Sequence, residues 1–225
     1  MKYPTPVDAR LWPYVCSLQM IFPQTAPGHF AVGSGCLIGR RTVLTAGHNV
    51  YDCWRGGKVL SVDVVFGDGD RIPVPAVEVD TTQQWIDTSC DRDPLSPFDF
   101  GVVVLPDFDH ETDPLPVVPA DDGDLSGVPL NVAGYPATPP PPHTLGTLFG
   151  ARAPAELDAA HPARIFYAIN TWDGMSGGPT YTFDSATQTR TVRGVHTSSV
   201  GRGSALRITT DVTAVVDEWL QLFEP

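Results

Sequence analysis

One serine stands in a setting that could make it a nucleophile. Ser176 lies in the stretch NTWDGMSGGPTY (residues 170–181), with Gly174 before it and Gly177 directly after it. Glycines let the backbone turn sharply so that N–H groups converge on one point, and the N–H groups of Gly174 and Ser176 are candidates for an oxyanion hole. A plain glycine turn would share this local pattern. Catalysis by Ser176 therefore requires a base and an orienting acid elsewhere in the chain.

A histidine and an aspartate are candidates for these two roles. His48 follows a β-branched run in RTVLTAGHNVYDC, which predicts an imidazole at the end of a strand. Asp99 precedes the most apolar run of the chain in SPFDFGVVVL, where an acid is partly buried and needs a donor such as an imidazole N–H. Taken alone, His48 could equally be a surface histidine in a turn. Three competing acids lie in a polar stretch and are interpreted as solvated: Asp87, Asp91 and Asp93.

The three motifs, taken in chain order, resemble those of a known family. TAGH, DFGVVVL and GMSGGP are similar to the His, Asp and Ser motifs of the chymotrypsin-like serine proteases, whereas subtilisin-like enzymes and α/β-hydrolases order these residues differently. The resemblance implies a serine endopeptidase in which Ser176 forms an acyl-enzyme, His48 moves the proton and Asp99 orients His48. It also implies two packed β-barrels of six strands each, with the site in the cleft between them.

The residues expected to line the substrate pocket resemble a narrower group. Asn170, six residues before the nucleophile, carries no charge, which argues against a preference for Lys or Arg. His196 and Thr171 resemble the pocket residues of the glutamyl endopeptidases (the V8-like group), where an imidazole and a hydroxyl bind the carboxylate of the substrate. Thr197 and Ser199 would pair with the substrate backbone as an added strand. The alternative for His196 is a core histidine on a strand.

Met175, directly before the nucleophile, bears on activation. In many chymotrypsin-like zymogens a new N-terminus pairs with an aspartate at this place, and a methionine cannot form that ion pair. The resemblance therefore implies that packing holds the oxyanion loop, as in the V8-like group. In that group the N-terminal amine also helps to bind the acidic side chain, a contact that remains open for a chain beginning at Met1.

Most of the chain is predicted to form short strands. β-branched and apolar runs with a period of two are separated by Gly, Pro and Asp, which favours an all-β fold of two packed antiparallel barrels over a parallel α/β sheet. A connector rich in Pro and Asp divides the strands into two sets. We expect an N-terminal barrel over residues 1–115 with His48 and Asp99, and a C-terminal barrel over residues 116–225 with Ser176.

One helix is predicted, at the C-terminus of the chain. Asp211 can cap it, and the apolar residues that follow have the spacing of a buried stripe. The members of this stripe are Val212, Val215, Val216, Trp219 and Leu220. We expect the helix to pack against the second set of strands.

Bulk properties exclude several kinds of partner. The chain has 225 residues and a formal net charge of −12, which argues against binding to a nucleic-acid backbone. No apolar run is long enough to span a membrane. We expect a monomer that acts on polypeptides, with no cofactor and no metal site. The compartment stays open, because no secretory signal follows Met1 whereas the family resemblance favours secretion.

The four cysteines allow three pairings, which the sequence does not decide between: Cys16, Cys36, Cys53 and Cys90. Cys36 and Cys53 flank His48, much as a histidine-loop disulfide does in many members of the family that the chain resembles. That pairing is what the resemblance implies, although Asn49 and not a cysteine follows the histidine directly.

A non-catalytic peptide-binding module on the same scaffold is the alternative from a different functional class. The presence of all three catalytic residue types in order counts against it. Covalent labelling by a fluorophosphonate probe, lost in Ser176→Ala, separates the two. Among proteases, a preference for small or aromatic side chains is the alternative to an acidic pocket.

Overall fold

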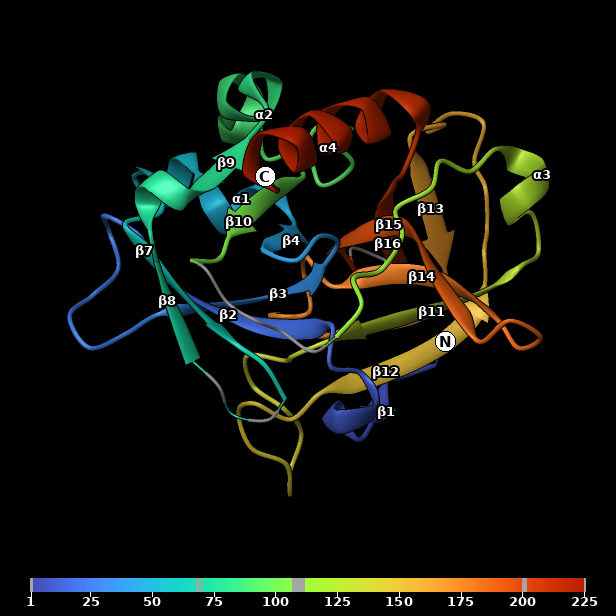
Figure 1. Ribbon diagram of the computed structural model, residues 1–225, viewed down its shortest axis with the longest axis horizontal. Helices are drawn as coiled ribbons and strands as arrows, with labels where there is room; N and C mark the ends of the chain where they lie inside the picture. The colour runs from blue at the N-terminus through green and yellow to red at the C-terminus, as the bar shows by residue number, and fades with distance from the viewer. Residues whose placement is uncertain (1, 68, 70, 107–111, 200–201, 225) are drawn as a thin grey trace.

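The computed structural model describes residues 2–67, 69, 71–106, 112–199 and 202–224, and it shows two curled antiparallel sheets side by side (Figure 1). The first sheet has the strand order β8-β7-β2-β3-β4-β10-β9. Its strands span Val15–Ile21 (β2), Ala31–Leu37 (β3), Thr42–Thr45 (β4), Ser61–Val65 (β7), Arg71–Pro75 (β8), Val79–Thr81 (β9) and Gly101–Val104 (β10).

The second sheet has the order β1-β12-β11-β14-β15-β16-β13. Its strands span Thr5–Pro6 (β1), Pro129–Gly134 (β11), Phe149–Pro154 (β12), Arg164–Tyr167 (β13), Pro179–Asp184 (β14), Thr189–Ser198 (β15) and Gly203–Arg207 (β16). A separate ribbon pairs Tyr51–Asp52 (β5) with Gly57–Lys58 (β6). The predicted all-β fold of two packed antiparallel barrels is confirmed. The resemblance implied six strands in each barrel, and a very short edge strand, β1 or β9, brings each described sheet to seven.

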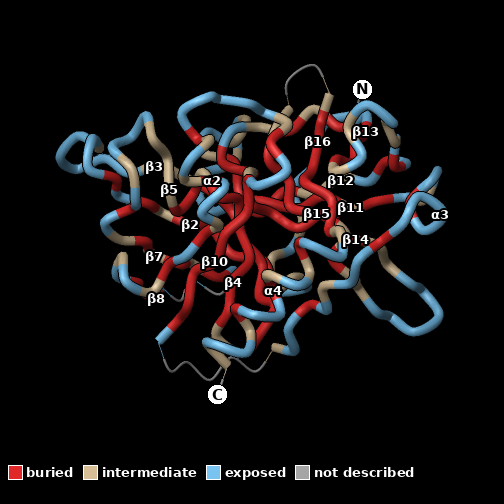
Figure 2. Tube along the Cα trace, turned by 90° about the horizontal axis from the view of Figure 1, so that it is seen from above, coloured by how far each residue is buried: buried red, intermediate tan, exposed pale blue. Residues whose placement is uncertain are grey.

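Burial follows the alternation of side chains along the strands. In β8 the side chains of Ile72 and Val74 are buried while their neighbours are exposed, as a sheet with one face toward the core requires. β10 is buried along its whole length, as its continuous apolar sequence predicted. It lies between β4 and β9, in the central region of buried chain seen in Figure 2.

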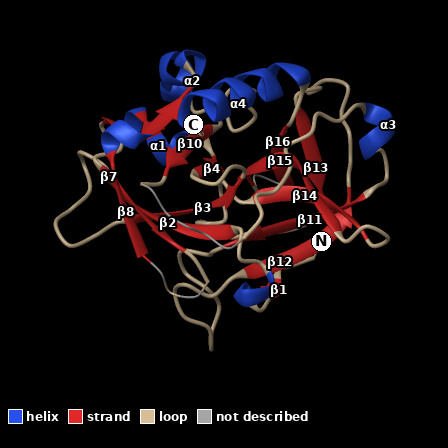
Figure 3. Ribbon diagram, viewed as in Figure 1, coloured by secondary structure: helices blue, strands red, loops and turns tan. Residues whose placement is uncertain are grey.

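The helices lie at the periphery of the sheets (Figure 3). They span Gly47–Val50 (α1), Gln83–Thr88 (α2), Asp122–Leu125 (α3) and Thr210–Phe223 (α4). Helix α4 is the predicted C-terminal helix, and its side chains at 212, 216 and 219 are buried as expected. Its N-cap, however, is Thr209, whose hydroxyl accepts from the backbone N–H of Val212. Asp211 lies inside the first turn instead, where its charge still suits the helix dipole.

Helix α4 ends over the first sheet, which corrects the expectation that it packs on the second. The Trp219 ring lies 5.6 Å from that of Phe100, and its N–H donates to the Asp80 carboxylate at 3.2 Å. Near the end of the chain, the Glu224 carboxylate accepts hydrogen bonds from the turn between β3 and β4, at Arg41 N (2.8 Å) and the Thr42 hydroxyl (2.7 Å). An amphipathic stripe predicts which face of a helix is buried but not which sheet buries it.

The two ends of the chain tie the sheets together. β1 pairs with β12 in the second sheet although it is the first strand of the chain, and α4 contacts the first sheet although it is the last helix. The division into domains at residues 115 and 116 stays a prediction.

A disulfide joins Cys53 and Cys90, whose Cα atoms are 5.3 Å apart. Cys16 and Cys36 are free and buried in the core on the neighbouring strands β2 and β3. The pairing of Cys36 with Cys53 is therefore wrong. Cys36 is on a central strand, whereas Cys53 begins a short turn after β5, beside the segment that carries Cys90.

Candidate active site

Strand pairing brings His48 and Asp99 together. β4 and β10 run antiparallel with Thr45 opposite Gly101. The chain reaches His48 in α1 just after β4 ends, and Asp99 comes just before β10 begins. Because antiparallel strands run in opposite directions, the residue that follows one and the residue that precedes the other meet at the same end. Two residues 51 positions apart in the sequence thus become neighbours.

The Asp99 carboxylate holds His48 by both its backbone and its ring. The His48 N–H donates to Oδ1 at 2.9 Å, and ring atom Nδ1 lies 2.8 Å from Oδ2. Asp99 is only 6% exposed, so these donors offset its loss of water. A carboxylate can only accept, which assigns the proton of a neutral ring to Nδ1 and leaves the lone pair on Nε2 able to take a proton.

The environment of His48 raises its pKa above the ordinary value of 6.5. Burial by itself lowers the pKa, because it disfavours the charged ring. The charge of Asp99 and its hydrogen bond raise the pKa by more, with a smaller rise from Asp52 and a fall from Arg55.

The loop that carries Ser176 requires its glycines. Gly174 and Gly177 have φ angles of +93° and +89°, a region that residues with side chains rarely adopt. A Cβ on Gly174 would collide with the backbone N of Ala137, and one on Gly177 would collide with the carbonyl oxygen of Ser34. The predicted sharp turn around Ser176 is present, and it is packed too closely for side chains at these two positions.

Ser34, a buried residue of β3, fastens this loop to the first sheet. Its backbone N–H donates to the Ser176 carbonyl oxygen at 2.8 Å. Its hydroxyl donates to the Gly174 carbonyl oxygen at 2.8 Å and accepts from the Tyr135 N–H at 2.8 Å. One side chain thus connects β3 with the nucleophile loop and the segment after β11.

Asn49, the residue after His48, makes a second connection. Its side-chain amide donates to the Ser176 carbonyl oxygen and to the Thr45 hydroxyl, both at 2.9 Å. Its buried side chain fills the space over Gly33, where even a Cβ would collide with it. We call Ser34 and Asn49 the Ser34–Asn49 clasp. These hydrogen bonds hold the loop where Met175 cannot form an ion pair.

The backbone around Ser176 leaves two donors unused. Within the described residues, neither the N–H of Gly174 nor that of Ser176 has an acceptor, so both are available to a substrate oxygen. The Ser176 hydroxyl donates a long hydrogen bond of 3.4 Å to the Thr197 carbonyl oxygen, and between the two described residues Ser176 and His48 there is no hydrogen bond. Such contacts often tighten only when a substrate is bound.

Two cavities meet at His48. One, of about 550 Å³, is lined by His48, Gly174 and Ser176 together with Phe30 and Leu145. The other, of about 500 Å³, lies on the side of Asp99 and Thr197 and is rimmed by aromatic and charged side chains: Trp54, Trp85, Arg55, Arg92 and Asp93. The two cavities together form a cleft with the His48 ring at its middle. A polypeptide bound along this cleft would extend into both cavities.

His196 and Thr171 meet as expected, but they are buried. His196 is 1% exposed and Thr171 7% exposed, and neither lines the two cavities at His48. The Thr171 hydroxyl lies 2.8 Å from ring atom Nε2 of His196. Ring atom Nδ1 lies 3.0 Å from the Ser204 carbonyl oxygen, which can only accept, and 2.6 Å from the Tyr167 hydroxyl. This assigns the proton to Nδ1, so that Nε2 accepts from Thr171.

Burial lowers the pKa of His196 from 6.5 to about 4, and the charges of Arg164 and His48 act in the same direction. The hydrogen bond to Ser204 opposes them without cancelling them. His196 is therefore neutral at pH 7.

The other predicted pocket residues lie around this pair. Asn170 directly precedes Thr171, and its backbone N–H donates to the carbonyl oxygen of Lys2 at 2.8 Å. The N-terminal segment thus lies along the segment that precedes the nucleophile. Thr197 follows His196 in β15, and the half-buried Ser199 comes just after that strand.

Three residues of the site were missed by sequence reasoning. Ser34 and Asn49 form the clasp, and Arg164 is a buried cation at the start of β13 that donates to the hydroxyl of Thr197. The position of Asn49 directly after His48 was a usable signal. Nothing local in the sequence singles out Ser34 or Arg164.

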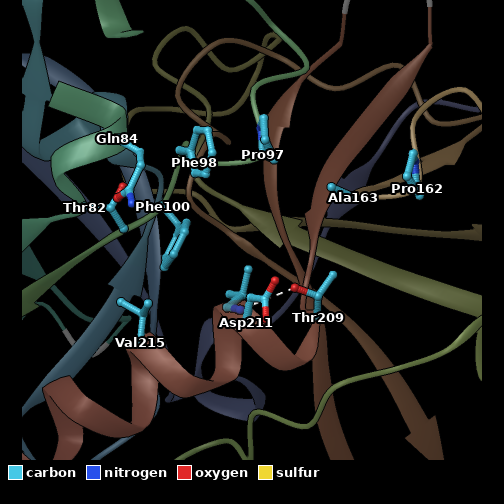
Figure 4. Close-up of a pocket in the computed structure, with 11 residues that line it drawn as sticks. Thr82, Gln84, Pro97, Phe98, Phe100, Pro162, Ala163, Thr209, Asp211 and Val215 are labelled. Carbon is cyan, nitrogen blue, oxygen red and sulfur yellow. Dashed lines mark hydrogen bonds between the residues drawn. The ribbon is translucent and has the colours of Figure 1, made fainter. Parts of the chain in front are cut away.

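A third cavity, of about 450 Å³, lies behind the segment that carries Asp99 (Figure 4). Phe98 and Phe100, which flank Asp99, line one side, and Val212 and Val215 of α4 line another. Its wall is largely apolar. It is separate from the two cavities that meet at His48.

Comparison with known proteins identifies the family. The model of the trypsin-like peptidase domain matches residues 33–186, which is more than half of the chain and includes His48, Asp99 and Ser176. The chain belongs to the trypsin-like peptidase family. This confirms the resemblance to the chymotrypsin-like serine proteases.

Individual relatives agree with this assignment. The chain is 27% identical over 212 residues to a glutamyl endopeptidase of Bacillus licheniformis, covering 88% of this chain and 64% of that protein, less than two thirds of its length. The structure of a Glu endopeptidase in complex with MPD is similar over 97% of this chain and 96% of its own, at a TM-score of 0.75 and 19% identity. The structure of the protease Anisep from Arthrobacter nicotinovorans is similar over 95% of this chain and 96% of its own, at a TM-score of 0.70 and 18% identity. At these identities the two structures support the fold alone.

Proposed function

We propose that the protein hydrolyses peptide bonds through His48, Asp99 and Ser176. The Ser176 hydroxyl attacks the peptide carbonyl while Nε2 of His48 takes its proton, and the proton then passes to the leaving amine. The N–H groups of Gly174 and Ser176 stabilise the oxyanion. Water subsequently hydrolyses the acyl-enzyme by the same route.

The observation that carries this proposal is the joint placement of three groups at one cleft. The His48 ring is held by a buried carboxylate on its Nδ1 side, and the same ring lines a cavity together with Ser176 and Gly174. The first contact fixes the ring orientation that proton transfer needs. The second brings base, nucleophile and oxyanion donors to one place for a substrate.

We further propose a preference for Glu, or Asp, before the cut. Support comes from the direct contact between His196 and Thr171, from the uncharged Asn170 beside them, and from the name of the Bacillus licheniformis relative. Thr197 and Ser199 are assigned to the substrate backbone. An acidic side chain entering here would meet the Thr171 hydroxyl, whose proton becomes available once Nε2 of His196 is protonated and no longer accepts it.

Binding of a carboxylate should add a proton to His196. The His196 ring is neutral at pH 7, and its Nε2 accepts from the Thr171 hydroxyl. A nearby carboxylate favours the charged ring and so raises the pKa of His196. The doubly protonated ring then donates from Nε2 to the substrate and from Nδ1 to the Ser204 carbonyl oxygen, which gives both protons an acceptor.

Matched peptides test the preference. We expect kcat/KM to be higher for peptides with Glu before the cut than for otherwise identical Gln peptides. In His196→Ala the ratio of the two kcat/KM values should fall close to one. His161→Ala is the control, because His161 pairs with Asp158 at the surface. Equal cleavage of the Glu and Gln peptides by the wild type would contradict the acidic pocket and favour small or aromatic side chains. Loss of cleavage of every peptide in Ser176→Ala separates the chemistry from the specificity.

A further inference from the structure

Arg164 carries a charge that is buried in an unusual way. Its side chain is 1% exposed, yet its hydrogen-bond partners are all neutral. Nη2 donates to the hydroxyls of Thr197 (2.5 Å) and Ser204 (2.8 Å), Nη1 donates to the Ser96 carbonyl oxygen (3.3 Å), and Nε has no partner among the described residues. Buried charges are normally paired, so some other group must balance this one.

A second buried arginine shows the ordinary arrangement. Arg207 of β16 lies 2.7 Å from the Asp122 carboxylate and donates twice to the Ala120 carbonyl oxygen. Arg164, by contrast, forms no ion pair with any acid in the part of the chain that the structure describes. The two arginines thus differ in what compensates their charge.

The acid that bears most on Arg164 is Asp99. Burial lowers the pKa of Arg164, and Asp99 is the foremost of the charges that raise it again. The contact with the Ser96 carbonyl oxygen joins Arg164 to the segment that leads into Asp99. The contact with the Thr197 hydroxyl joins it to the residue whose carbonyl oxygen accepts from Ser176.

We propose that Arg164 is a positioning residue for the triad, whose buried charge balances Asp99 and weakens the pull of Asp99 on the His48 proton. This inference rests on the proposed triad. Arg164 does not touch the substrate or the reacting atoms. It fixes the segment before Asp99 and the strand that faces Ser176, and it acts on His48 through Asp99.

The sign of the effect follows from the charges. The negative charge of Asp99 favours the protonated ring of His48 and so raises its pKa. The positive charge of Arg164 offsets part of the Asp99 charge and so lowers the pKa of His48. Removing Arg164 should therefore raise the pKa of His48. The other charged or titratable groups that face these two residues stay in place in every variant: Asp52 and Arg55 near His48, and Tyr167, Asp93 and His196 near Arg164.

The test is the titration of the His48 ring by NMR in the full chain. Arg164→Met removes the charge and keeps an unbranched side chain, whereas Arg164→Lys keeps the charge. We expect the pKa of His48 to rise in Arg164→Met and to stay at the wild-type value in Arg164→Lys. If Arg164 had only a structural role, the pKa of His48 would not differ between the two variants.

Arg207→Met is the matched control, since it removes a buried arginine that has its own carboxylate. We expect it to leave the His48 titration unchanged. A folded Arg164→Met variant with an unmoved His48 titration would overturn the inference, as would an equal shift in Arg207→Met.

If Arg164→Met does not fold, the double variant Asp99→Asn/Arg164→Met decides. Removing both charges should give a protein that folds at least as well as Asp99→Asn alone. A double variant that stays unfolded while Asp99→Asn folds would contradict a balance between the two residues.

Fluorophosphonate labelling of the wild type separates this inference from the proposed function. A wild type that is not labelled at Ser176 contradicts the proposed function, whatever the variants show. A labelled wild type with an unmoved titration in Arg164→Met overturns the role of Arg164 alone.

Discussion

At the scale of single residues, the site depends on which ring nitrogen of each histidine carries a proton. Asp99 pairs with Nδ1 of His48 and leaves Nε2 free for the nucleophile. The Ser204 carbonyl oxygen pairs with Nδ1 of His196 and leaves Nε2 facing Thr171. The two rings are nevertheless opposite in tendency: His48 is stabilised in its charged form by an acid, and His196 is kept neutral by burial. This difference suits the roles proposed for the two rings, proton transfer for His48 and substrate binding for His196.

The raised pKa of His48 predicts the acid limb of the activity. Catalysis needs the neutral ring, so kcat/KM should fall as the pH drops through the His48 pKa, with a midpoint above 6.5. A peptide with Gln before the cut is the right substrate, because it carries no carboxylate into the pocket. A midpoint at or below 6.5 in the wild type would mean that Asp99 does not act on His48 as the geometry indicates.

At the scale of elements, two strand ends and one loop build the site. β4 and β10 deliver His48 and Asp99 to the same end of the first sheet. The loop of Ser176 belongs to the second sheet, and the Ser34–Asn49 clasp ties it to the first sheet by donating to its carbonyl oxygens at 174 and 176. The direction of the Ser176 N–H depends on this anchoring, because its peptide plane lies between the two planes whose carbonyl oxygens are held.

We predict that Asn49→Ala lowers activity more than it lowers stability. In the variant the Ser176 carbonyl oxygen keeps the Ser34 N–H as a donor and loses the Asn49 amide, a net loss of about 0.5–1.5 kcal/mol. If that loss falls on the oxyanion loop, kcat/KM drops by about twofold to tenfold. Asn131→Ala is the matched control, since the Asn131 amide donates a weak 3.4 Å hydrogen bond to the Tyr181 carbonyl oxygen, away from the loop. Equal activity of the two variants would argue against the clasp.

At the scale of the whole molecule, both ends of the chain make contacts that link the two sheets. β1 joins the second sheet and the end of α4 grips the turn between β3 and β4 through Glu224. The net charge of −12 repels acidic substrates at long range, but salt screens this repulsion beyond about 10 Å, so the overall charge is compatible with the proposed preference for an acidic side chain.

The buried His196 predicts acid lability of the whole fold. Its pKa is about 4 in the folded protein against 6.5 when unfolded, so the unfolded state binds its proton first. The stabilisation is fully present above pH 6.5 and is lost as the pH falls toward 4, by about 3 kcal/mol in all. Denaturant unfolding of the wild type and of His196→Gln between pH 7 and 4 measures this. Parallel pH curves for the two proteins would contradict the assignment.

Much of this arrangement is encoded locally and could be predicted. β-branched runs predict the strands, the continuous apolar run predicts the buried β10, and the short motifs predict the meeting of His48 with Asp99. Contacts that depend on the tertiary structure were not predicted. These are the pairing of Cys53 with Cys90, the sheet on which α4 ends, and the two hydroxyls that accept from Arg164, which lie 33 and 40 residues away in the sequence. In each case the local pattern fixes burial or reactivity but not the partner.

The most direct test of the central claim is covalent labelling of the native protein by a fluorophosphonate, with the modified residue located by peptide mass spectrometry. The account predicts one modification, on Ser176, with a rate that falls as the pH drops through the His48 pKa and that is strongly reduced in Asp99→Asn. A folded wild-type protein that reacts at another residue, or does not react at all, would contradict the account.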